Sequence, residues 1–188
     1  PGPPPVFMTP TAVRVSRTTP FSGGCLATSG TIYTNAEAEA HLAIDPTNPN
    51  HLIATWQQDR LSDGGALGNV VAVSIDGGIT WSAPRAIAFS QCAGGPFARA
   101  SDPWVSINGV AAFHAGIAFT GATLGPGSRS AVLVARSTDG GFNWSAPIAV
   151  ADDDGALYFN DKETLTADPY DPRYVYAVWD RLDTADRG

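Results

Sequence analysis

Residues 74–84 have the sequence Ser-Ile-Asp-Gly-Gly-Ile-Thr-Trp-Ser-Ala-Pro, and residues 137–147 have the closely related sequence Ser-Thr-Asp-Gly-Gly-Phe-Asn-Trp-Ser-Ala-Pro. The two copies are 63 residues apart, measured from Asp76 to Asp139. A fixed internal period indicates a repeat architecture, in which each copy belongs to one supersecondary unit. The repeated stretch therefore constrains the fold more strongly than the propensities of single segments do.

The residue types of the repeated stretch predict a tight turn between two strands. The segments before it, residues 70–74 and 130–136, are rich in apolar and β-branched side chains and are predicted to be strands. Glycine accepts a positive φ without steric cost. A turn aspartate accepts hydrogen bonds from N–H groups just downstream, and tryptophan fixes the turn to its neighbour through its large apolar area. We therefore predict structural roles for Asp76, Gly78, Trp81, Asp139, Gly141 and Trp144.

Composition narrows the class of protein. The 188 residues include 44% hydrophobic and only 15% charged side chains, with 20 Gly and 15 Pro, which is typical of an all-β chain with many turns. The net charge of −7 disfavours nucleic acids and anionic membranes as partners. No run approaches the roughly 20 consecutive apolar residues of a membrane span. We therefore expect no nucleic-acid partner and no membrane span.

A second recurring element supports a repeat of strands. Asp45 lies 11 residues before Trp56, and Asp168 lies 11 residues before Trp179. In both places an Asp-Pro turn separates two strand-like segments, and residues 102–113 contain a shortened version of the same pattern. Together with the Gly-rich turn, this pattern predicts units of four antiparallel strands.

The repeated turn, Ser-x-Asp-x-Gly-x-x-Trp, resembles the Asp box, also called the BNR repeat, of the sialidase superfamily of β-propellers. The resemblance implies an all-β propeller built from four-stranded antiparallel blades, with six blades in sialidase-like proteins. The same hairpin occurs in sialidases, other glycoside hydrolases, sorting receptors and assembly factors. It therefore predicts the architecture and leaves the activity to other residues.

The repeats divide the chain into blades. We expect an N-terminal extension at residues 1–35, a first blade at 36–98, a second at 99–158 and part of a third at 159–188. Closed propellers contain about four to eight blades. About two and a half blades are therefore expected to be completed by further blades of the same polypeptide or by a partner chain. A strand within Val6–Arg17 is a candidate to close the ring.

The resemblance also indicates where catalytic residues would lie. Sialidases use three arginines to bind the substrate carboxylate, an aspartate acid/base, and a tyrosine nucleophile activated by glutamate. The first of these arginines belongs to an Arg-Ile-Pro motif, and the matching stretch here, residues 38–41, contains no arginine. Asp63 occupies the position of the acid/base, and Asp59 is the second candidate. The alternative for both is a polar loop with local turns.

Other carboxylates are candidates for binding a ligand or a metal ion. Glu39, Asp102 and Asp161 stand at the starts of the predicted blades, where the first strands line the central channel. They either converge on a ligand or cation, or hold the adjoining blade. No cofactor is required by the sequence, and Ca²⁺ is the one candidate ion. Its candidate ligands are three consecutive carboxylates, Asp152, Asp153 and Asp154. The alternative is that these residues form a solvated loop without a metal ion.

Two features bear on the compartment. Cys25 and Cys92 lack a metal-binding spacing, which leaves a disulfide and two free thiols as alternatives. The chain begins with Pro-Gly-Pro-Pro-Pro rather than Met, so we expect that an N-terminal segment such as a signal peptide has been removed. The expected location is secreted, extracellular or on the cell surface, with the periplasm as an alternative.

Two functions from different classes follow. The first is a secreted propeller acting on carbohydrate, like an exo-sialidase or a related glycoside hydrolase, with Asp63 as the acid. The second is a non-catalytic extracellular propeller that binds a glycan or a protein, or builds a surface assembly. The family resemblance favours the first, and the missing Arg-Ile-Pro arginine favours the second. Whether the chain is an enzyme stays open at this point.

Overall fold

A computed structural model describes residues 11–21, 23, 25 and 29–183. Within them the chain is all-β, as predicted, with one 3₁₀ helix, η1 (Gln91–Ala93), and no α-helix. No described helix has the length and hydrophobicity that crossing a membrane requires. The strands are β1 (Ile32–Asp45), β2 (Asn48–Leu61), β3 (Ala66–Ser74), β4 (Arg85–Ala86), β5 (Arg99–Asn108), β6 (Ala111–Thr120), β7 (Arg129–Ser137), β8 (Ile148–Asp154), β9 (Tyr158–Ala167) and β10 (Val175–Asp183).

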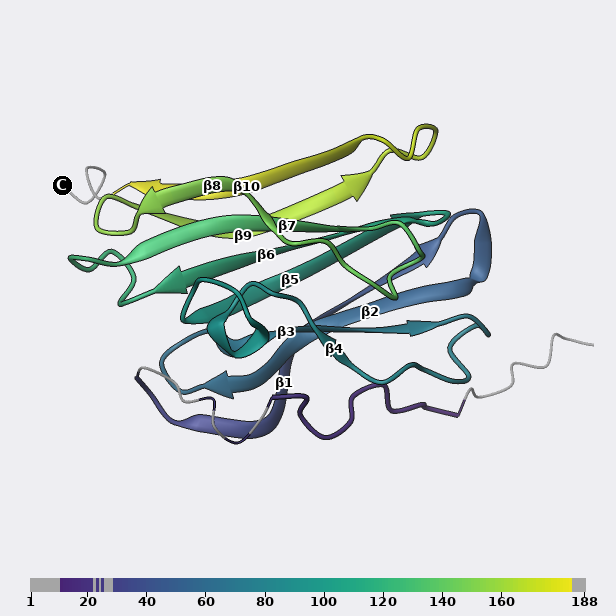
Figure 1. Cartoon of the computed structure of the whole chain (residues 1–188), viewed down its shortest axis with the longest axis horizontal. Helices are drawn as coiled ribbons and strands as arrows, with labels where there is room; N and C mark the ends of the chain where they lie inside the picture. Colours follow the sequence, from purple (N-terminus) through teal and green to yellow (C-terminus); the bar gives the residue numbers. More distant parts are fainter. Residues whose placement is uncertain (1–10, 22, 24, 26–28, 184–188) are drawn as a thin grey trace, which may run out of the picture.

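The strands form two four-stranded antiparallel units followed by a hairpin (Figure 1). β1 to β4 pair in order as the first unit, and β5 to β8 pair in order as the second unit. β9 and β10 form the third unit. One residue pair, Ala66 with Ala100, joins the first two units at their edges. The units lie in layers from β1 to β10, and the described strands form no closed ring.

The N-terminal part of the chain differs from the prediction. β1 begins at Ile32, before the expected start of the first blade at residue 36. Residues 11–17 form no strand with the described units, and residues 6–10 lie outside the described residues, so the closing strand within Val6–Arg17, which would pair with a further blade, stays a prediction. Val15 packs on the first unit, and Arg17 donates a hydrogen bond to the carbonyl of Trp81.

The N-terminal segment is fastened to the first unit at several points. Phe21 is buried against Trp56 and Leu67 in one hydrophobic cluster. A disulfide joins Cys25 to Cys92, which is one of the two states left open by the sequence. Because Cys92 lies in η1, the disulfide ties the segment to the connection between β4 and β5.

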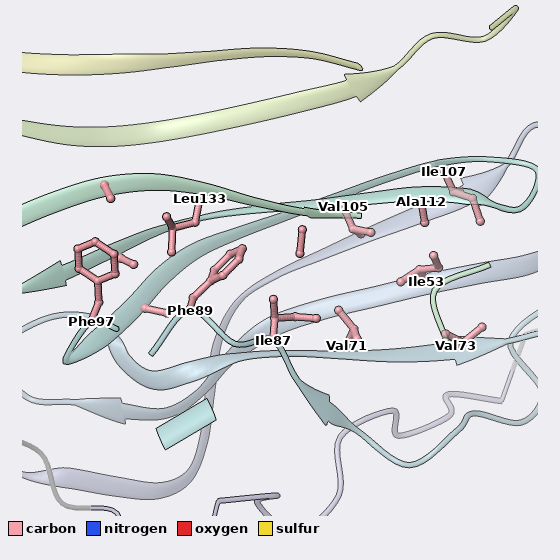
Figure 2. Close-up of a cluster of buried hydrophobic side chains, with 14 residues drawn as sticks. Ile53, Val71, Val73, Ile87, Phe89, Phe97, Val105, Ile107, Ala112 and Leu133 are labelled. Atoms are coloured by element: carbon pink, nitrogen blue, oxygen red, sulfur yellow. The ribbon is translucent and has the colours of Figure 1, made fainter. Parts of the chain in front are cut away.

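Apolar side chains fill the space between successive units. Figure 2 shows the cluster between the first and second units, where β2 and β3 face β5 and β7. A second cluster lies between the second and third units, where β6 faces β9 and β10. The first cluster includes Ile53, Val71, Val73, Val105, Ile107 and Leu133, and the second includes Phe113, Ala115, Leu165, Ala167 and Val175.

The first strand of every unit has a β-bulge at the same position. The pairing of β1 with β2 shifts between Ala38 and His41, and that of β5 with β6 shifts between Ser101 and Trp104. The pairing of β9 with β10 shifts between Val178 and Asp180, where two residues of β9 lie opposite one residue of β10. A bulge bends the strand and redirects the side chains near it. Its first residue has a positive φ in all three units: Glu39 (51°), Asp102 (44°) and Lys162 (52°).

Candidate functional site

The three bulges border one cavity of about 420 Å³, which we call the bulge cavity. Each unit contributes three consecutive residues: 39–41 from β1, 102–104 from β5 and 162–164 from β9. The layered packing of the units brings these equivalent positions together, although they are about 60 residues apart in the sequence. The repeat therefore builds a single site from three equivalent strands.

A network of hydrogen bonds connects the polar side chains of the bulge cavity. Lys162 Nζ donates to Asp102 Oδ2 at 2.8 Å, and Ser101 Oγ donates to Asp102 Oδ1. Gln57 Nε2 donates to Glu39 Oε2 and, at 3.0 Å, to Ser101 Oγ. The network crosses all three units, so it fixes the relative positions of their bulges.

Glu39 and Asp102 have opposite pKa shifts. Burial raises the pKa of Glu39, and its hydrogen bond to Asp102 raises it further. Burial also acts to raise the pKa of Asp102, but hydrogen bonds from Lys162 and Ser101 outweigh it and lower that pKa. Of the two carboxyl groups, Glu39 therefore holds a proton more readily, and Asp102 carries the negative charge beside Lys162.

An aromatic pair forms another part of the cavity wall. The rings of His41 and Trp104 stack with centroids 3.9 Å apart and an interplanar angle of 23°. Burial lowers the pKa of His41, which favours the neutral imidazole. The cavity thus combines a flat aromatic surface with carboxyl groups and one ammonium group.

Glu163 is the most deeply buried ionisable group of the bulge cavity. Its side chain is only 4% exposed, and its two carboxyl oxygens have no hydrogen-bond partner among the described residues. Burial, followed by the charges of Asp102 and Asp161, raises the pKa of Glu163 to about 9. At neutral pH the group is therefore uncharged.

Two of the three carboxylates predicted to line the channel are bulge residues. Glu39 and Asp102 occupy the bulges of β1 and β5, and the equivalent residue of β9 is Lys162. Asp161 precedes the bulge and pairs with Asp180. Glu39, Asp102 and Asp161 do border a second, smaller cavity of about 210 Å³ together. The three predicted carboxylates therefore lie near one another, although only two of them are bulge residues.

The sequence contained a signal for the bulge residue of β9. The Asp-Pro turns at Asp45 and Asp168 are equivalent, and the same separation relates Glu39 to Lys162. Alignment on these turns, rather than on residue type, places Lys162 at the bulge. His41, Trp104 and Glu163, which sequence reasoning also missed, follow from this alignment because they are the neighbours of the bulge residues.

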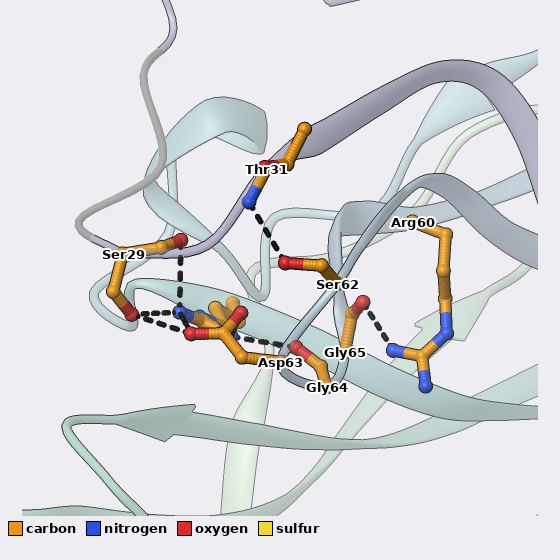
Figure 3. A network of polar contacts seen from close by, with 8 residues as sticks. Ser29, Thr31, Arg60, Ser62, Asp63, Gly64 and Gly65 are labelled. Carbon is orange, nitrogen blue, oxygen red and sulfur yellow. Dashed lines mark hydrogen bonds and ion pairs between the residues drawn. The ribbon is translucent and has the colours of Figure 1, made fainter.

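Asp63, the first candidate for a general acid, is held in an ion pair (Figure 3). Arg99 Nη1 and Nη2 donate to its two carboxylate oxygens at 2.7 and 3.0 Å, and Ser29 Oγ donates at 2.8 Å. The hydrogen bonds from Arg99, with that from Ser29, lower the pKa of Asp63 to about 2. An effective general acid has a pKa near the working pH. This geometry fastens the N-terminal segment and does not suit proton donation.

Asp59, the second candidate, is buried and also holds the N-terminal segment. Thr19 Oγ1 donates to its Oδ2 at 2.6 Å, and the backbone N–H of Asn35 donates to its Oδ1 at 2.7 Å. Asp59 is not among the residues that line the bulge cavity. The contacts therefore favour the local structural role over catalysis.

The three consecutive aspartates lie in strand β8 and not in the solvated loop that was the alternative to a Ca²⁺ site. Asp152 accepts hydrogen bonds from Arg129, and Asp153 accepts them from Arg181. Asp154 accepts one from the backbone of Ala156 at 3.0 Å. Alternating strand geometry separates neighbouring carboxylates, and no group of the described residues has the arrangement of a metal site. We therefore derive no Ca²⁺ site from them.

The two Asp boxes have matching internal hydrogen bonds. Asp76 Oδ1 accepts from the backbone of Thr80 at 2.9 Å, and Trp81 Nε1 donates to the carbonyl of Gly78 at 3.0 Å. Side-chain and backbone hydrogen bonds from Thr80 lower the pKa of Asp76 to about 2. Asp139, Asn143, Trp144 and Gly141 repeat these contacts, with the same pKa for Asp139.

The second Asp box also contacts the first unit. His51 Nε2 lies 2.8 Å from the carbonyl oxygen of Gly140, and Arg85 Nη1 donates to the carbonyl of Phe142 at 2.9 Å. Gly141 is buried against Ile53. In contrast, Gly78 of the first Asp box is only half-buried. The Asp box is therefore both a turn and a contact between units.

The chain matches no protein-family model and no curated protein.

Proposed function

We propose that the three units are consecutive blades of a sialidase-like Asp-box β-propeller, and that the bulge cavity binds carbohydrate. The observation that carries this proposal is the convergence of the bulge residues of β1, β5 and β9 on one cavity. The first strand of a blade lines the central channel of a propeller. A site shared by three such strands therefore corresponds to a ligand site at the axis.

The apolar faces at the two ends of the stack support the propeller. Phe113 of β6 is 4% exposed beneath the third unit, but Tyr176, the equivalent residue of β10, is 59% exposed. Ile107 of β5 is 4% exposed against the first unit, but Ile44, the equivalent residue of β1, is 55% exposed. Large apolar patches mark surfaces for association. Further blades, from the same polypeptide or a partner chain, would cover both faces as the described units cover each other.

The chemistry of the bulge cavity favours a sugar as the ligand. Sugar rings present apolar faces that pack on aromatic rings, and Trp104 supplies such a surface. Their hydroxyl groups pair with convergent polar groups, here the carboxyl groups of Glu39 and Asp102. A largely apolar wall with a few polar groups is the usual composition of a small-molecule site.

Binding without hydrolysis is the function that the described residues favour. The residues lining the bulge cavity include no arginine to grip a sialic acid carboxylate, and Asp63 is neutralised by Arg99. We therefore propose a glycan-binding module rather than an exo-sialidase. The disulfide of Cys25 with Cys92 supports a secreted or cell-surface location, because disulfides persist in oxidising compartments.

The test is the effect of Trp104→Ala on oligosaccharide binding. Loss of the aromatic surface is expected to weaken binding roughly tenfold, which corresponds to about 1.4 kcal/mol. Calorimetry with a panel of neutral, acidic and amino oligosaccharides measures the affinity. Tyr170→Ala is the matched control, because Tyr170 is 94% exposed in the turn between β9 and β10 and does not line the cavity. Equal losses in the two variants, or no binding to any member of the panel, would contradict the proposal.

A further inference from the structure

Glu163 breaks the pattern of the repeat. The second residue of each bulge is Ala40 in the first unit, Pro103 in the second and Glu163 in the third. Two units therefore form the same bulge with a small or apolar residue at this position. The bulge does not need a carboxyl group, so the reason for Glu163 must lie elsewhere.

The carboxyl group of Glu163 is unfavourable for folding in the absence of a partner. Its side chain is 4% exposed, and neither carboxyl oxygen has a hydrogen-bond partner among the described residues. Burying a polar group without a hydrogen bond is destabilising. Residues that break a local rule without a structural gain are expected at functional sites. Glu163 lines the bulge cavity, so a bound ligand is the natural partner.

The charges around Glu163 indicate the type of ligand. The charged groups that act on Glu163 are Asp102 of β5 and, on its own strand, Asp161 and Lys162. Glu39 of β1 lines the same cavity. Three carboxyl groups line the cavity, and its one ammonium group, that of Lys162, already donates to Asp102. The cavity therefore offers no donor to the oxygens of Glu163. A metal ion does not fit, because no group of the described residues has a metal-binding arrangement. An organic cation, which carries both hydrogen-bond donors and a positive charge, is therefore the expected partner of Glu163.

We propose that the carbohydrate of the bulge cavity is an amino sugar whose protonated amine binds Glu163. This inference rests on the proposed function and specifies its ligand. The ammonium group donates hydrogen bonds to the carboxyl oxygens, and the carboxyl proton is released to solvent as the ion pair forms. Burial strengthens the resulting charge-assisted hydrogen bonds. The free site keeps its proton, because an uncompensated charge at this depth is unfavourable.

The experiment compares three tetrasaccharides with the same β-1,4 linkage, made of glucosamine, N-acetylglucosamine or glucose. Binding to the 188-residue chain is measured by calorimetry at about pH 6, in buffers of different ionisation enthalpy. The glucosamine tetrasaccharide is expected to bind roughly tenfold more tightly than the other two. Glu163→Gln should remove this preference. The wild type should release up to one more proton per binding event than the variant.

The outcomes separate the two proposals. Equal affinity for the three tetrasaccharides, or a preference that survives in Glu163→Gln, overturns the amino-sugar inference and leaves carbohydrate binding in place. If none of the three binds, both proposals are wrong for this class of sugar. Glu163→Ala gives the third bulge the residue found at Ala40 of the first unit, and it serves as a second variant if glutamine disturbs the fold.

Discussion

Replacing Glu163 with glutamine is expected to make the protein more stable than the wild type at about pH 8, by roughly 2–5 kcal/mol. Burial, followed by the charges of Asp102 and Asp161, raises the pKa of Glu163 from 4.5 to about 9. Between these values the folded protein keeps a proton that the unfolded chain has released. The free energy of unfolding therefore falls as the pH rises through this range. Glutamine does not titrate, so the variant lacks this part of the pH dependence.

Urea denaturation at about pH 5 and pH 8 measures the effect. The two proteins should differ little at the lower pH, where the carboxyl group is protonated in the folded state. Glu37→Gln, at an exposed position of β1, controls for the loss of one acidic residue from a chain of net charge −7. If the stability difference between the wild type and Glu163→Gln were the same at both pH values, Glu163 would not be the group that releases a proton on unfolding.

Substitution of Gly141 by alanine is expected to destabilise the protein by about 2–4 kcal/mol, against about 1 kcal/mol for Gly78→Ala. Both glycines occupy the same position of an Asp box and have similar positive φ angles, 93° and 88°. A Cβ atom at Gly141 would lie 2.6 Å from Ile53 Cδ1 in the core between the first two units. At Gly78 the nearest atom would be a Trp81 ring carbon at 3.7 Å. The backbone strain is shared, and the steric clash affects only Gly141.

Thermal and chemical denaturation of the two variants separates the stability contribution of the contact between units from that of the turn itself. We expect a clearly larger loss of stability for Gly141→Ala. Equal losses, or a larger loss for Gly78→Ala, would mean that the Asp box contributes only its local turn. Either result would remove the Asp box from the packing of one unit on the next.

Local features of the fold were predictable from the sequence. The hydrogen bonds of Asp76 and Asp139 join residues within a few positions, so residue types at fixed spacing specify them. The strands before the Asp boxes follow from runs of apolar residues for the same reason. Repetition then extends these local predictions to the all-β architecture.

The roles of single carboxylates depend on partners that are distant in the sequence. Asp63 was predicted as an acid from its position in the family resemblance. Its ion-pair partner, Arg99, is 36 residues away, and no local pattern joins the two. The burial of Glu163 arises from the packing of the third unit on the second, which only the folded chain shows. The β-bulges, and with them the place of Lys162 in the bulge cavity, depend on the pairing register of β9 with β10. Long-range pairing and register, rather than composition, decide these roles.

Protection of Lys162 from an amine-reactive reagent tests the ligand site most directly. Lys162 is the single lysine of the sequence, its side chain is 63% exposed, and it lines the bulge cavity. Mass spectrometry can follow its modification with and without the N-acetylglucosamine tetrasaccharide, which contains no amine to consume the reagent. We predict that saturating tetrasaccharide slows modification of Lys162 several-fold and leaves that of the chain's α-amino group unchanged. An unchanged rate at Lys162, while calorimetry shows that the sugar is bound, would place the ligand outside the bulge cavity and contradict the account.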